Sequence, residues 1–517
     1  MRIKEIVRPI FAAILLFAVM IGFTSCREKD EFVFEINDDG TAVLAEYHGE
    51  GGHVQVPDSY EGMPVAEIGS FAFGHKLSVT SVTLPETVKK IDKYAFVGAA
   101  AITSVDVNGG AVTIGEGAFS GCRGLEKIEL TISGELPKWA FKSCTSLKSA
   151  EIEGATSIGF GAFSGCISLH SFSVPGDTKE IYAKAFEGCV SLGKVSVGEQ
   201  VEKIGRRCFG NTAAEISFRA PSSYTKVESE TFSDCYGASI YLPSTITHIS
   251  SRSFAGCTAE IVFDSKMNID ATSGMFSEYK GRVIKLPESV RTIYNGAFSE
   301  TSAEIVFPEN GNLTRIDIGG FVEYKGEELV IPATVSYIGE SAFLNCESNI
   351  RFEENSALTD IGMRAFEGWL GTSISLPEGL KYIGDGAFYE SKNLESIVIP
   401  EGVKNLGEDA FGLCYSLKDI DLSRVKNIGT GAFFGCTALE GIVLPDSVEI
   451  IGEAAFGGCD FLTSVVINRG VKTIKTQAFG ACPSLVSINY AGSREEWDRV
   501  ELENGLEAIG YCTVIFD

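Results

Sequence analysis

Residues 428–445 read Ile-Gly-Thr-Gly-Ala-Phe-Phe-Gly-Cys-Thr-Ala-Leu-Glu-Gly-Ile-Val-Leu-Pro, and variants of this phrase fill most of the 517-residue chain. Phe433 in this phrase belongs to a series of 19 phenylalanines, from Phe73 to Phe479, whose members follow one another at 22 or 23 residues. Self-similarity at such a period is typical of stacked repeats, in which each repeat adds one layer to a continuous core. The spacing therefore predicts a solenoid of about 19 layers.

The residue types within one phrase indicate how a layer is built. Leu439, Ile442 and Leu444 are spaced as in a leucine-rich-repeat strand, whose apolar side chains pack on their equivalents in the layers above and below. Gly429 is expected to supply backbone freedom at a tight corner. Phe433 and Cys436 are three residues apart, so they would lie on one side of a short helical turn.

The repeated combination of Ala-Phe-x-x-Cys, Ile-Gly and Leu-Pro resembles the BspA-like bacterial leucine-rich repeats over about residues 60–490. Residues 490–493 with Trp497 are similar to the carboxy-terminal cap of that family. The resemblance implies a β-rich, right-handed leucine-rich-repeat solenoid, with a parallel sheet on one face and short helical turns and loops on the other. It also implies a cell-surface or secreted binding protein, since several members of the family are regarded as adhesins.

The amino terminus is typical of an exported protein. Basic residues precede an apolar run at 10–21, as in a secretory signal peptide. Residues 23–26, Phe-Thr-Ser-Cys, resemble the bacterial lipobox, in which the cysteine, here Cys26, becomes lipidated. An ordinary cleaved signal is the alternative. Residues 27–31 resemble an acidic signal that sends some lipoproteins of Bacteroidetes to the outer face of the outer membrane.

The chain is therefore expected to contain five segments. Asp-Gly at residues 39 and 40, between alternating apolar runs, is a hairpin signal and favours a cap on the first layer. The expected segments are a lipoprotein signal peptide at 1–25, an acidic tether at 26–31, a capping β-hairpin at 32–59, the repeats at 60–489 and a carboxy-terminal cap at 490–517.

Charge and motif content argue against several functions. The net charge of −26 repels phosphate backbones and anionic lipid surfaces, so nucleic-acid binding is not expected. Eleven of the 14 cysteines follow a repeat phenylalanine by three residues, which favours buried free thiols over disulfides. No CxxC pair, HExxH, GxSxG or Walker loop is present, so no enzyme, metal or cofactor is predicted.

The repeat spacing changes in a central block. In the outer layers the strand isoleucine follows the phenylalanine by nine residues, but between Phe209 and Ile374 the interval alternates between seven and eight. The unit of this block, over about 209–374, is therefore a pair of layers, and a change of curvature or twist is expected there. Either an adaptive binding region or neutral drift of a duplicated unit would account for it.

Function is expected to depend on the outward residues of the strands, because the repeated apolar positions point inward. The candidate binding residues on the sheet face are Tyr241, Lys285, Arg351, Ser375 and Asp421. Our first hypothesis is a lipid-anchored, adhesin-like protein on the outer membrane of a Gram-negative bacterium, facing outward and binding host extracellular proteins or other bacterial surface proteins. A glycan-binding accessory of nutrient uptake is an alternative, although the three tryptophans are far apart in the sequence. A spacer without a ligand is the other.

Overall fold

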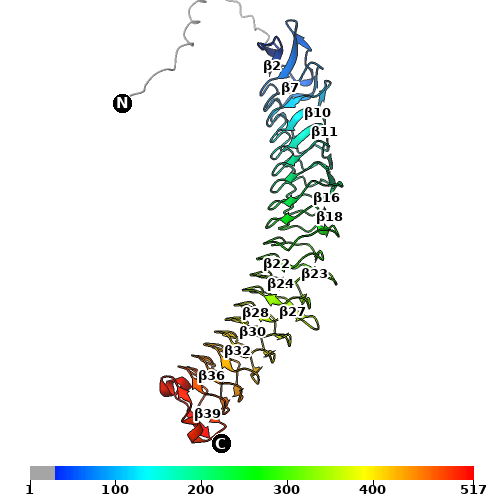
Figure 1. Cartoon of the computed structure of the whole chain (residues 1–517). Coiled ribbons are helices and arrows are strands. Elements are labelled where there is room, and N and C mark those ends of the chain that lie inside the picture. The colour runs from blue at the N-terminus through cyan, green and yellow to red at the C-terminus, as the bar shows by residue number, and fades with distance from the viewer. Residues whose placement is uncertain (1–29, 517) are drawn as a thin grey trace, which may run out of the picture.

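The computed structural model describes residues 30–516, which form an elongated solenoid of about 21 turns (Figure 1). The predicted repeat solenoid is confirmed. The predicted number of layers was too low because the end layers lack the repeat phenylalanine. In the first layer Tyr47 takes its place and stacks on Phe73 with 5.3 Å between ring centroids.

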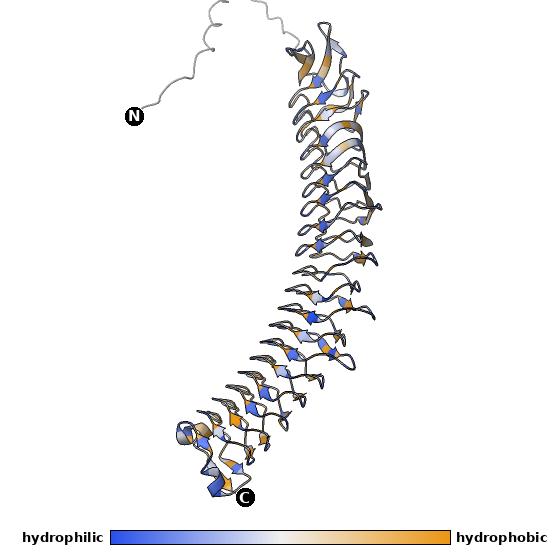
Figure 2. Cartoon of the chain, in the orientation of Figure 1, coloured by the Kyte–Doolittle hydropathy of each residue, from blue (hydrophilic) through white to orange (hydrophobic). Residues whose placement is uncertain are grey.

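One strand of each turn joins a column that we call the long-strand ladder. Neighbouring members pair in parallel except at β8/β10, β20/β21, β23/β25, β27/β29 and β33/β35. In each strand the isoleucine-type residue is buried and its neighbours face outward, so polar and apolar colours alternate along these strands in Figure 2. The members are β3 (Gly52–Gln55), β6 (Val79–Leu84), β8 (Ser104–Val107), β10 (Lys127–Leu136), β11 (Ser149–Ile158), β12 (Ser171–Ser173), β14 (Lys194–Val197), β16 (Glu215–Phe218), β18 (Ser239–Leu242), β20 (Glu260–Phe263), β21 (Val283–Lys285), β23 (Glu304–Val306), β25 (Glu328–Ile331), β27 (Asn349–Phe352), β29 (Ser373–Ser375), β31 (Ser396–Val398), β33 (Asp419–Asp421), β35 (Gly441–Leu444), β37 (Ser464–Ile467), β39 (Ser487–Tyr490) and β41 (Thr513–Phe516).

The solenoid also has a second parallel column of strands, which we call the short-strand ladder. The sequence predicted a sheet on one face only, so this second column was not expected. It is built from the residues that precede the Ile-Gly corner, and β10 and β11 are long enough to contribute to both ladders. Its other members are β2 (Ala42–Tyr47), β5 (Met63–Ile68), β7 (Lys90–Ile91), β9 (Thr113–Ile114), β13 (Glu180–Ile181), β15 (Lys203–Ile204), β17 (Lys226–Val227), β19 (His248–Ile249), β22 (Thr292–Ile293), β24 (Arg315–Ile316), β26 (Tyr337–Ile338), β28 (Asp360–Ile361), β30 (Tyr382–Ile383), β32 (Asn405–Leu406), β34 (Asn427–Ile428), β36 (Ile450–Ile451), β38 (Thr473–Ile474) and β40 (Glu501–Leu502).

The two ends of the solenoid differ from its middle. At the amino-terminal end β1 (Phe32–Ile36) and β2 (Ala42–Tyr47) form an antiparallel hairpin, and β4 (Ser59–Tyr60) pairs with β5 (Met63–Ile68). At the other end α1 (Arg494–Trp497) and the 3-10 helix η1 (Gly505–Ile509) are the only helices in the described part of the chain. Both ends thus place irregular structure over the last layers.

The repeat phenylalanines form the centre of the core. Every consecutive pair from Phe73 to Phe479 is stacked, as Phe411 and Phe433 are, with 5.5 Å between their centroids and 4° between their planes. All 19 rings are buried. Each contributes about 1.5–3 kcal/mol of hydrophobic stabilisation, so this column is a large part of the drive to fold.

The segments around these phenylalanines are chains of tight turns, and the short helices expected there are absent from residues 30–516 outside the carboxy-terminal end. Alternate amides bond within the layer and across layers: Cys436 donates to the carbonyl oxygen of Phe433 at 3.2 Å, whereas Phe433 donates to that of Ala455 at 2.8 Å. The segment therefore adds a third set of hydrogen bonds between layers, which a helix could not make.

The role expected for Gly429 was wrong. This glycine does not adopt a positive φ, so no corner requires its conformational freedom. A Cβ at this position would instead lie 2.5 Å from the carbonyl oxygen of Gly407 in the preceding layer. Glycine is present because the backbones of the two layers approach each other closely.

All 13 cysteines in the described part of the chain are free, and the 11 that follow a repeat phenylalanine by three residues place their thiols beside the ring column. The Sγ of Cys436, for example, donates to the carbonyl oxygen of Phe411 in the preceding layer at 3.2 Å. Cys482 and Cys512 are half-buried near the carboxy-terminal end, and the other 11 are buried. The thiols thus act as small core residues that also bond between layers.

Thiol reagents should distinguish the end of this column from its interior. Burial raises the pKa of Cys122 and Cys436 to about 12, and a thiol reacts as its thiolate. At pH 8 we expect Cys482, whose pKa is lowered by a hydrogen bond with Cys459, to react first, Cys512 more slowly, and the buried thiols only after unfolding. Mass spectrometry after iodoacetamide pulses checks this order. Rapid native labelling of Cys122 would contradict it.

The axis of the solenoid changes direction in the central block, between β18 and β22, as the altered spacing predicted (Figure 1). The short-strand ladder is interrupted there, because β15 does not pair with β17 and β19 does not pair with β22. In alternate layers a large buried aromatic residue takes the cysteine position, and its polar atom donates to a carbonyl of the preceding layer. These residues are Tyr279, Tyr324 and Trp369.

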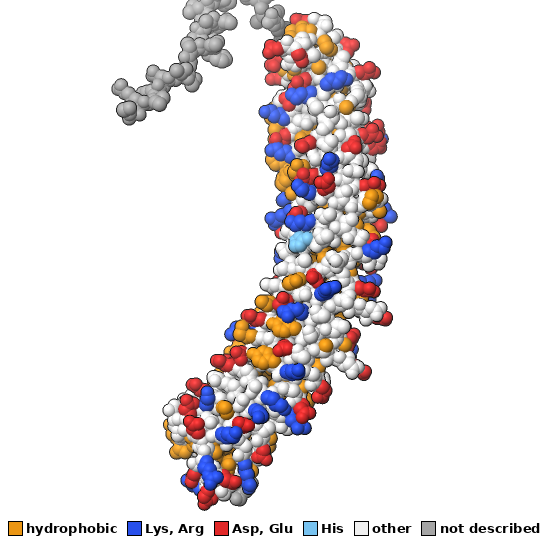
Figure 3. All heavy atoms as spheres, in the orientation of Figure 1, with side chains coloured by type: hydrophobic (Ala, Val, Ile, Leu, Met, Phe, Trp, Pro, Cys, Tyr) orange, Lys and Arg blue, Asp and Glu red, His pale blue; other side chains and the backbone are white. Residues whose placement is uncertain are grey.

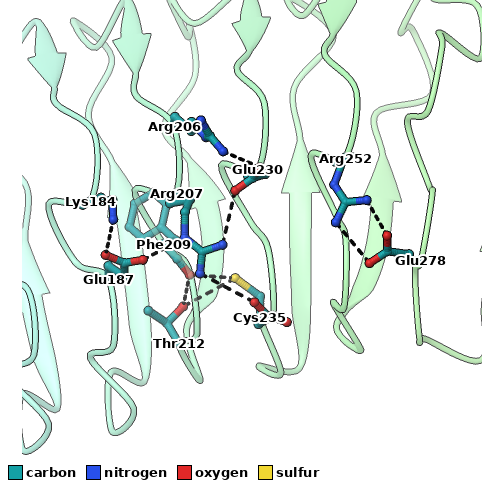
Figure 4. A network of polar contacts seen from close by, with 11 residues as sticks. Lys184, Glu187, Arg206, Arg207, Phe209, Thr212, Glu230, Cys235, Arg252 and Glu278 are labelled. Carbon is teal, nitrogen blue, oxygen red and sulfur yellow. Dashed lines mark hydrogen bonds and ion pairs between the residues drawn. The ribbon is translucent and has the colours of Figure 1, made fainter.

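A network of ion pairs crosses the first interruption. The guanidinium of Arg207 contacts Glu187 at 2.7 Å in one neighbouring layer and Glu230 at 3.2 Å in the other, and Arg206 also contacts Glu230 (Figure 4). Hydrogen bonds from Arg206 and Arg207 lower the pKa of Glu230 in spite of its partial burial. Charged side chains thus connect layers whose short strands do not pair.

Candidate functional site

The five candidate binding residues all lie at outward positions of the long-strand ladder. Within each paired group of strands the register places them at the outward position, since Tyr241 is opposite Val262, Lys285 is opposite Val306, and Arg351 is opposite Val330. In the same way Ser375 and Asp421 flank Val398 on neighbouring strands. The prediction that these side chains lie on one face of the sheet is therefore correct, although they extend over many layers.

Their surroundings differ along the column. Tyr241 is half-buried, and its hydroxyl donates to Asp264, which raises the pKa of the tyrosine. Lys285 is exposed and lies 3.5 Å from Glu260. Asp421 is also exposed and accepts a hydrogen bond from the amide of Ser423. These three residues are separated from one another by at least one layer and line no common cavity.

Arg351 and Ser375 lie on either side of a cleft. They belong to β27 and β29, which are neighbours in the stack but do not pair. Behind them β28 pairs with both β26 and β30, so the layers remain joined at the short-strand ladder while they open at the long-strand ladder. The opening has a volume of about 880 Å³. We call it the 349–379 cleft.

The lining of the 349–379 cleft is polar at its rim and apolar at its base. Arg351, Glu353 and Glu378 supply charge at the rim, and Ile374 and Leu376 lie beneath. Such a mixture of charged groups around a small apolar base is typical of recognition sites. The other lining residues are Asn349, Ile350, Phe352, Asn355, Ser356, Ser373, Ser375, Pro377 and Gly379.

Arg351 is held in place at the rim. Its Nε and Nη2 atoms donate to the two carboxylate oxygens of Glu328, at 2.7 Å and 3.3 Å. This hydrogen bonding lowers the pKa of Glu328. A bidentate pair of this kind orients the guanidinium plane, so Arg351 is held in a defined orientation at the rim of the cleft.

Most of the cleft was not identified from the sequence. Glu353, Asn355 and Ser356 come from the longer connection that replaces the Leu-Pro corner in the short-interval layers. That lengthening was the available signal, since it marks layers with extra surface residues. It did not indicate that β27 and β29 would separate.

The described residues contain neither a metal-binding cluster nor a membrane-spanning helix. Within residues 30–516 no three histidine, cysteine, aspartate or glutamate side chains gather as a metal ion would require. The same residues contain no helix that is long and apolar enough to cross a membrane. Cys26, the predicted lipidation site, and the predicted signal peptide lie outside the described residues.

Comparison with known proteins identifies the repeat type. The model of the BspA type leucine rich repeat region matches in six overlapping copies, at residues 66–193, 134–261, 179–304, 268–389, 314–440 and 359–486. No curated protein matches the chain.

Several solved structures are similar. A leucine rich cell surface protein from Faecalibacterium prausnitzii A2-165 is 21% identical, with 94% of this chain and 98% of that chain covered and a TM-score of 0.33. A leucine-rich repeat protein from Bacteroides ovatus is 20% identical, with 95% and 99% covered and a TM-score of 0.35. The pneumococcal vaccine antigen PcpA is 15% identical, with 95% and 98% covered and a TM-score of 0.29.

Proposed function

The chain belongs to the BspA type leucine-rich repeat family, and from this premise we propose that it is a cell-surface protein whose long-strand face binds other proteins. Stacked repeats expose long surfaces that suit extended partners. The partners proposed are host extracellular proteins or surface proteins of other bacteria, which gives the protein an adhesin-like role.

The 349–379 cleft is the observation that carries this proposal. It lies at one of five places where neighbouring strands of the long-strand ladder do not pair, has charged groups at its rim and apolar residues at its base, and contains two of the residues expected to bind. A protein partner would place an apolar side chain over Ile374 and an acidic group beside Arg351. Neighbouring outward residues would then add contacts along the ladder.

Attachment to the membrane is proposed through Cys26. The basic start, the apolar run and the lipobox-like residues 23–26 support a lipidated amino terminus. The acidic residues that follow support export to the outer face of the outer membrane. The solenoid would then extend from the cell surface, with its amino-terminal end nearest the membrane.

The cleft can be tested by reversing its charge and filling it. Full-length protein is applied at physiological salt to an array of extracellular-matrix and bacterial surface proteins. For any protein captured, the double variant Arg351→Glu/Ser375→Arg should bind at least about tenfold more weakly, because a buried interfacial charge pair is lost and the opening is blocked.

A matched control is available in the chain. Arg424 has 56% of its side chain exposed, against 57% for Arg351, and it also pairs with a glutamate of the preceding layer. The double variant Arg424→Glu/Ser423→Arg makes the same chemical change outside the cleft and should keep full binding. Equal binding by the two double variants would mean that the 349–379 cleft is not the binding site. Absence of any captured protein would favour a spacer.

A further inference from the structure

A second surface feature lies on the turn segments of the amino-terminal half. Four aromatic side chains, Phe71, Tyr94, Trp139 and Phe160, lie two or three residues before a repeat phenylalanine, so the stacking of layers places them along one face. Phe71 is 53% exposed and Phe160 is 40% exposed. We call these four residues the aromatic column.

The aromatic column is continuous through direct contacts. The rings of Phe71 and Tyr94 stack at 5.4 Å, and the Tyr94 hydroxyl donates to Glu116 at 2.7 Å. Glu116 in turn pairs with Lys138 at 3.1 Å, and the Lys138 ammonium lies 5.0 Å from the centre of the Trp139 ring.

The column continues into the next layer, where the Trp139 and Phe160 rings meet edge to face at 6.3 Å. Five successive layers thus take part between Phe71 and Phe160, and the layer of Glu116 and Gly117 contributes no ring.

The backbone at these rings is unfavourable for large side chains. Phe71, Tyr94 and Trp139 all have φ near +60°, where a bulky residue has a conformational cost. At the same position other layers have glycine or a non-aromatic residue such as Lys184 or Arg252, also with positive φ. Two of the glycines, Gly117 and Gly161, leave space for the rings of Tyr94 and Trp139. The positive φ is therefore a property of the layer, and the rings are what distinguishes these positions.

Positive charge accompanies the rings. Lys93 and Lys138 precede Tyr94 and Trp139, and the Lys142 ammonium lies 5.5 Å from the centre of the Trp139 ring. Among the described residues, neither Lys93 nor Lys142 has an ion-pair partner. Figure 3 shows lysine and arginine side chains with hydrophobic groups between them along the left edge of the amino-terminal half. In a chain of net charge −26 this combination favours an anionic ligand with apolar faces.

We propose that the aromatic column binds an extended polysaccharide that contains uronate units. The apolar faces of pyranose rings stack on aromatic side chains, and their carboxylates would pair with Lys93 and Lys142. Successive core rings in this region are 4.9–5.3 Å apart, which is close to the length of one pyranose unit in an extended chain. A polysaccharide running along the solenoid would therefore advance by about one unit per layer and meet a ring in four of the five layers of the aromatic column.

This site is separate from the 349–379 cleft in position and in ligand class. It does not depend on the proposed protein-binding function, and either can fail without the other. A protein that binds through the same rings is the competing occupant. The regular layer repeat and the unpaired lysines favour the polysaccharide, because a folded protein surface has no reason to match that repeat.

The test uses full-length protein in affinity electrophoresis with polygalacturonate, a linear polyuronate, and with xylan, a mostly neutral polymer. We expect retention by polygalacturonate that falls as salt is raised, and at least tenfold weaker retention by xylan. Trp139→Ala and Tyr94→Ala should each weaken retention at least tenfold, and Lys93→Gln/Lys142→Gln should weaken it several-fold. Thermal melting of each variant confirms that the protein remains folded.

Two controls match these variants. Tyr511 is 74% exposed and also has a positive φ, but it lies at the carboxy-terminal end, so Tyr511→Ala should retain binding. Lys266→Gln/Lys280→Gln removes two exposed lysines elsewhere and should have no effect. The proposal is overturned if polygalacturonate does not retain the protein, if xylan retains it equally, or if folded Trp139→Ala binds normally. It is also overturned if the only ligand that depends on these rings is a protein.

Discussion

Replacing Phe433 with alanine is expected to lower the free energy of unfolding by about 3–5 kcal/mol. Phe433 has no exposed surface, and its ring stacks on Phe411 at 5.5 Å and on Phe456 at 5.1 Å. Truncation removes both stacks and leaves a cavity between layers that cannot close, because the strands on either side fix the layer spacing. The shift in the urea midpoint measures the effect.

The neighbouring residue is the matched control for this substitution. Phe434 is 43% exposed, and its ring lies on the surface of the same turn segment. Phe434→Ala should change the free energy of unfolding by less than about 1 kcal/mol, since a partly exposed ring loses little on truncation. Similar shifts of the urea midpoint for Phe433→Ala and Phe434→Ala would mean that stacking of the buried rings does not stabilise the layer.

The loss of stability caused by Phe433→Ala should also be confined to the neighbouring layers. In a solenoid each layer contacts only its neighbours, so a weak layer can open while distant layers stay folded. Hydrogen exchange of the Phe433→Ala protein should therefore increase between about residues 410 and 480 and stay unchanged around Phe96. A uniform increase along the chain would indicate that the solenoid unfolds as one cooperative unit.

Replacing Cys26 with alanine is expected to release the protein from the membrane. Each buried CH₂ of a lipid chain contributes about 0.8 kcal/mol, so two or more acyl chains anchor a protein stably on a membrane. Without the cysteine no acyl chain can be attached. Cell fractionation should then move most of the protein from the membrane pellet to the soluble fraction.

Protease treatment of intact cells completes this test. The wild-type solenoid should be removed by external protease if it faces outward, while a periplasmic marker protein stays protected. Ser25→Ala is a suitable control, because it alters the same segment without removing the thiol. Membrane association of Cys26→Ala equal to that of the control would contradict the anchor.

The sequence predicted the layer well because the residues of its phrase are repeated and buried. Phe433, Cys436, Leu439, Ile442 and Leu444 have the same role in nearly every turn, so their pattern is reinforced many times over. The outward column of candidate binding residues could be predicted for the same reason. Alternation along a strand places every second side chain outside.

Features that depend on how layers sit relative to one another could not be predicted. The reason for Gly429 became clear only from its distance to Gly407, and the separation of β27 from β29 has no marker in the sequence of either strand. The number of layers was underestimated because the first layer carries Tyr47, and not a phenylalanine, in the column of stacked rings.

The aromatic column was missed for a different reason. Counting tryptophans alone made the aromatic residues look scattered, whereas Phe71, Tyr94 and Trp139 occupy the same position in their repeats. Aligning all aromatic side chains by their distance from the repeat phenylalanine would have found the group. Their positive φ values and the charges around them required the structure.

The repeated residues build the solenoid, and the 349–379 cleft is the site on it proposed to bind a protein partner. The most direct test is hydrogen exchange of the full-length protein with and without the partner captured from the array. Amides of β27 and β29 face an unpaired edge, so a bound partner should slow their exchange while peptides in the distant amino-terminal layers stay unchanged. Unchanged exchange at residues 349–379, with protection elsewhere, would contradict the account.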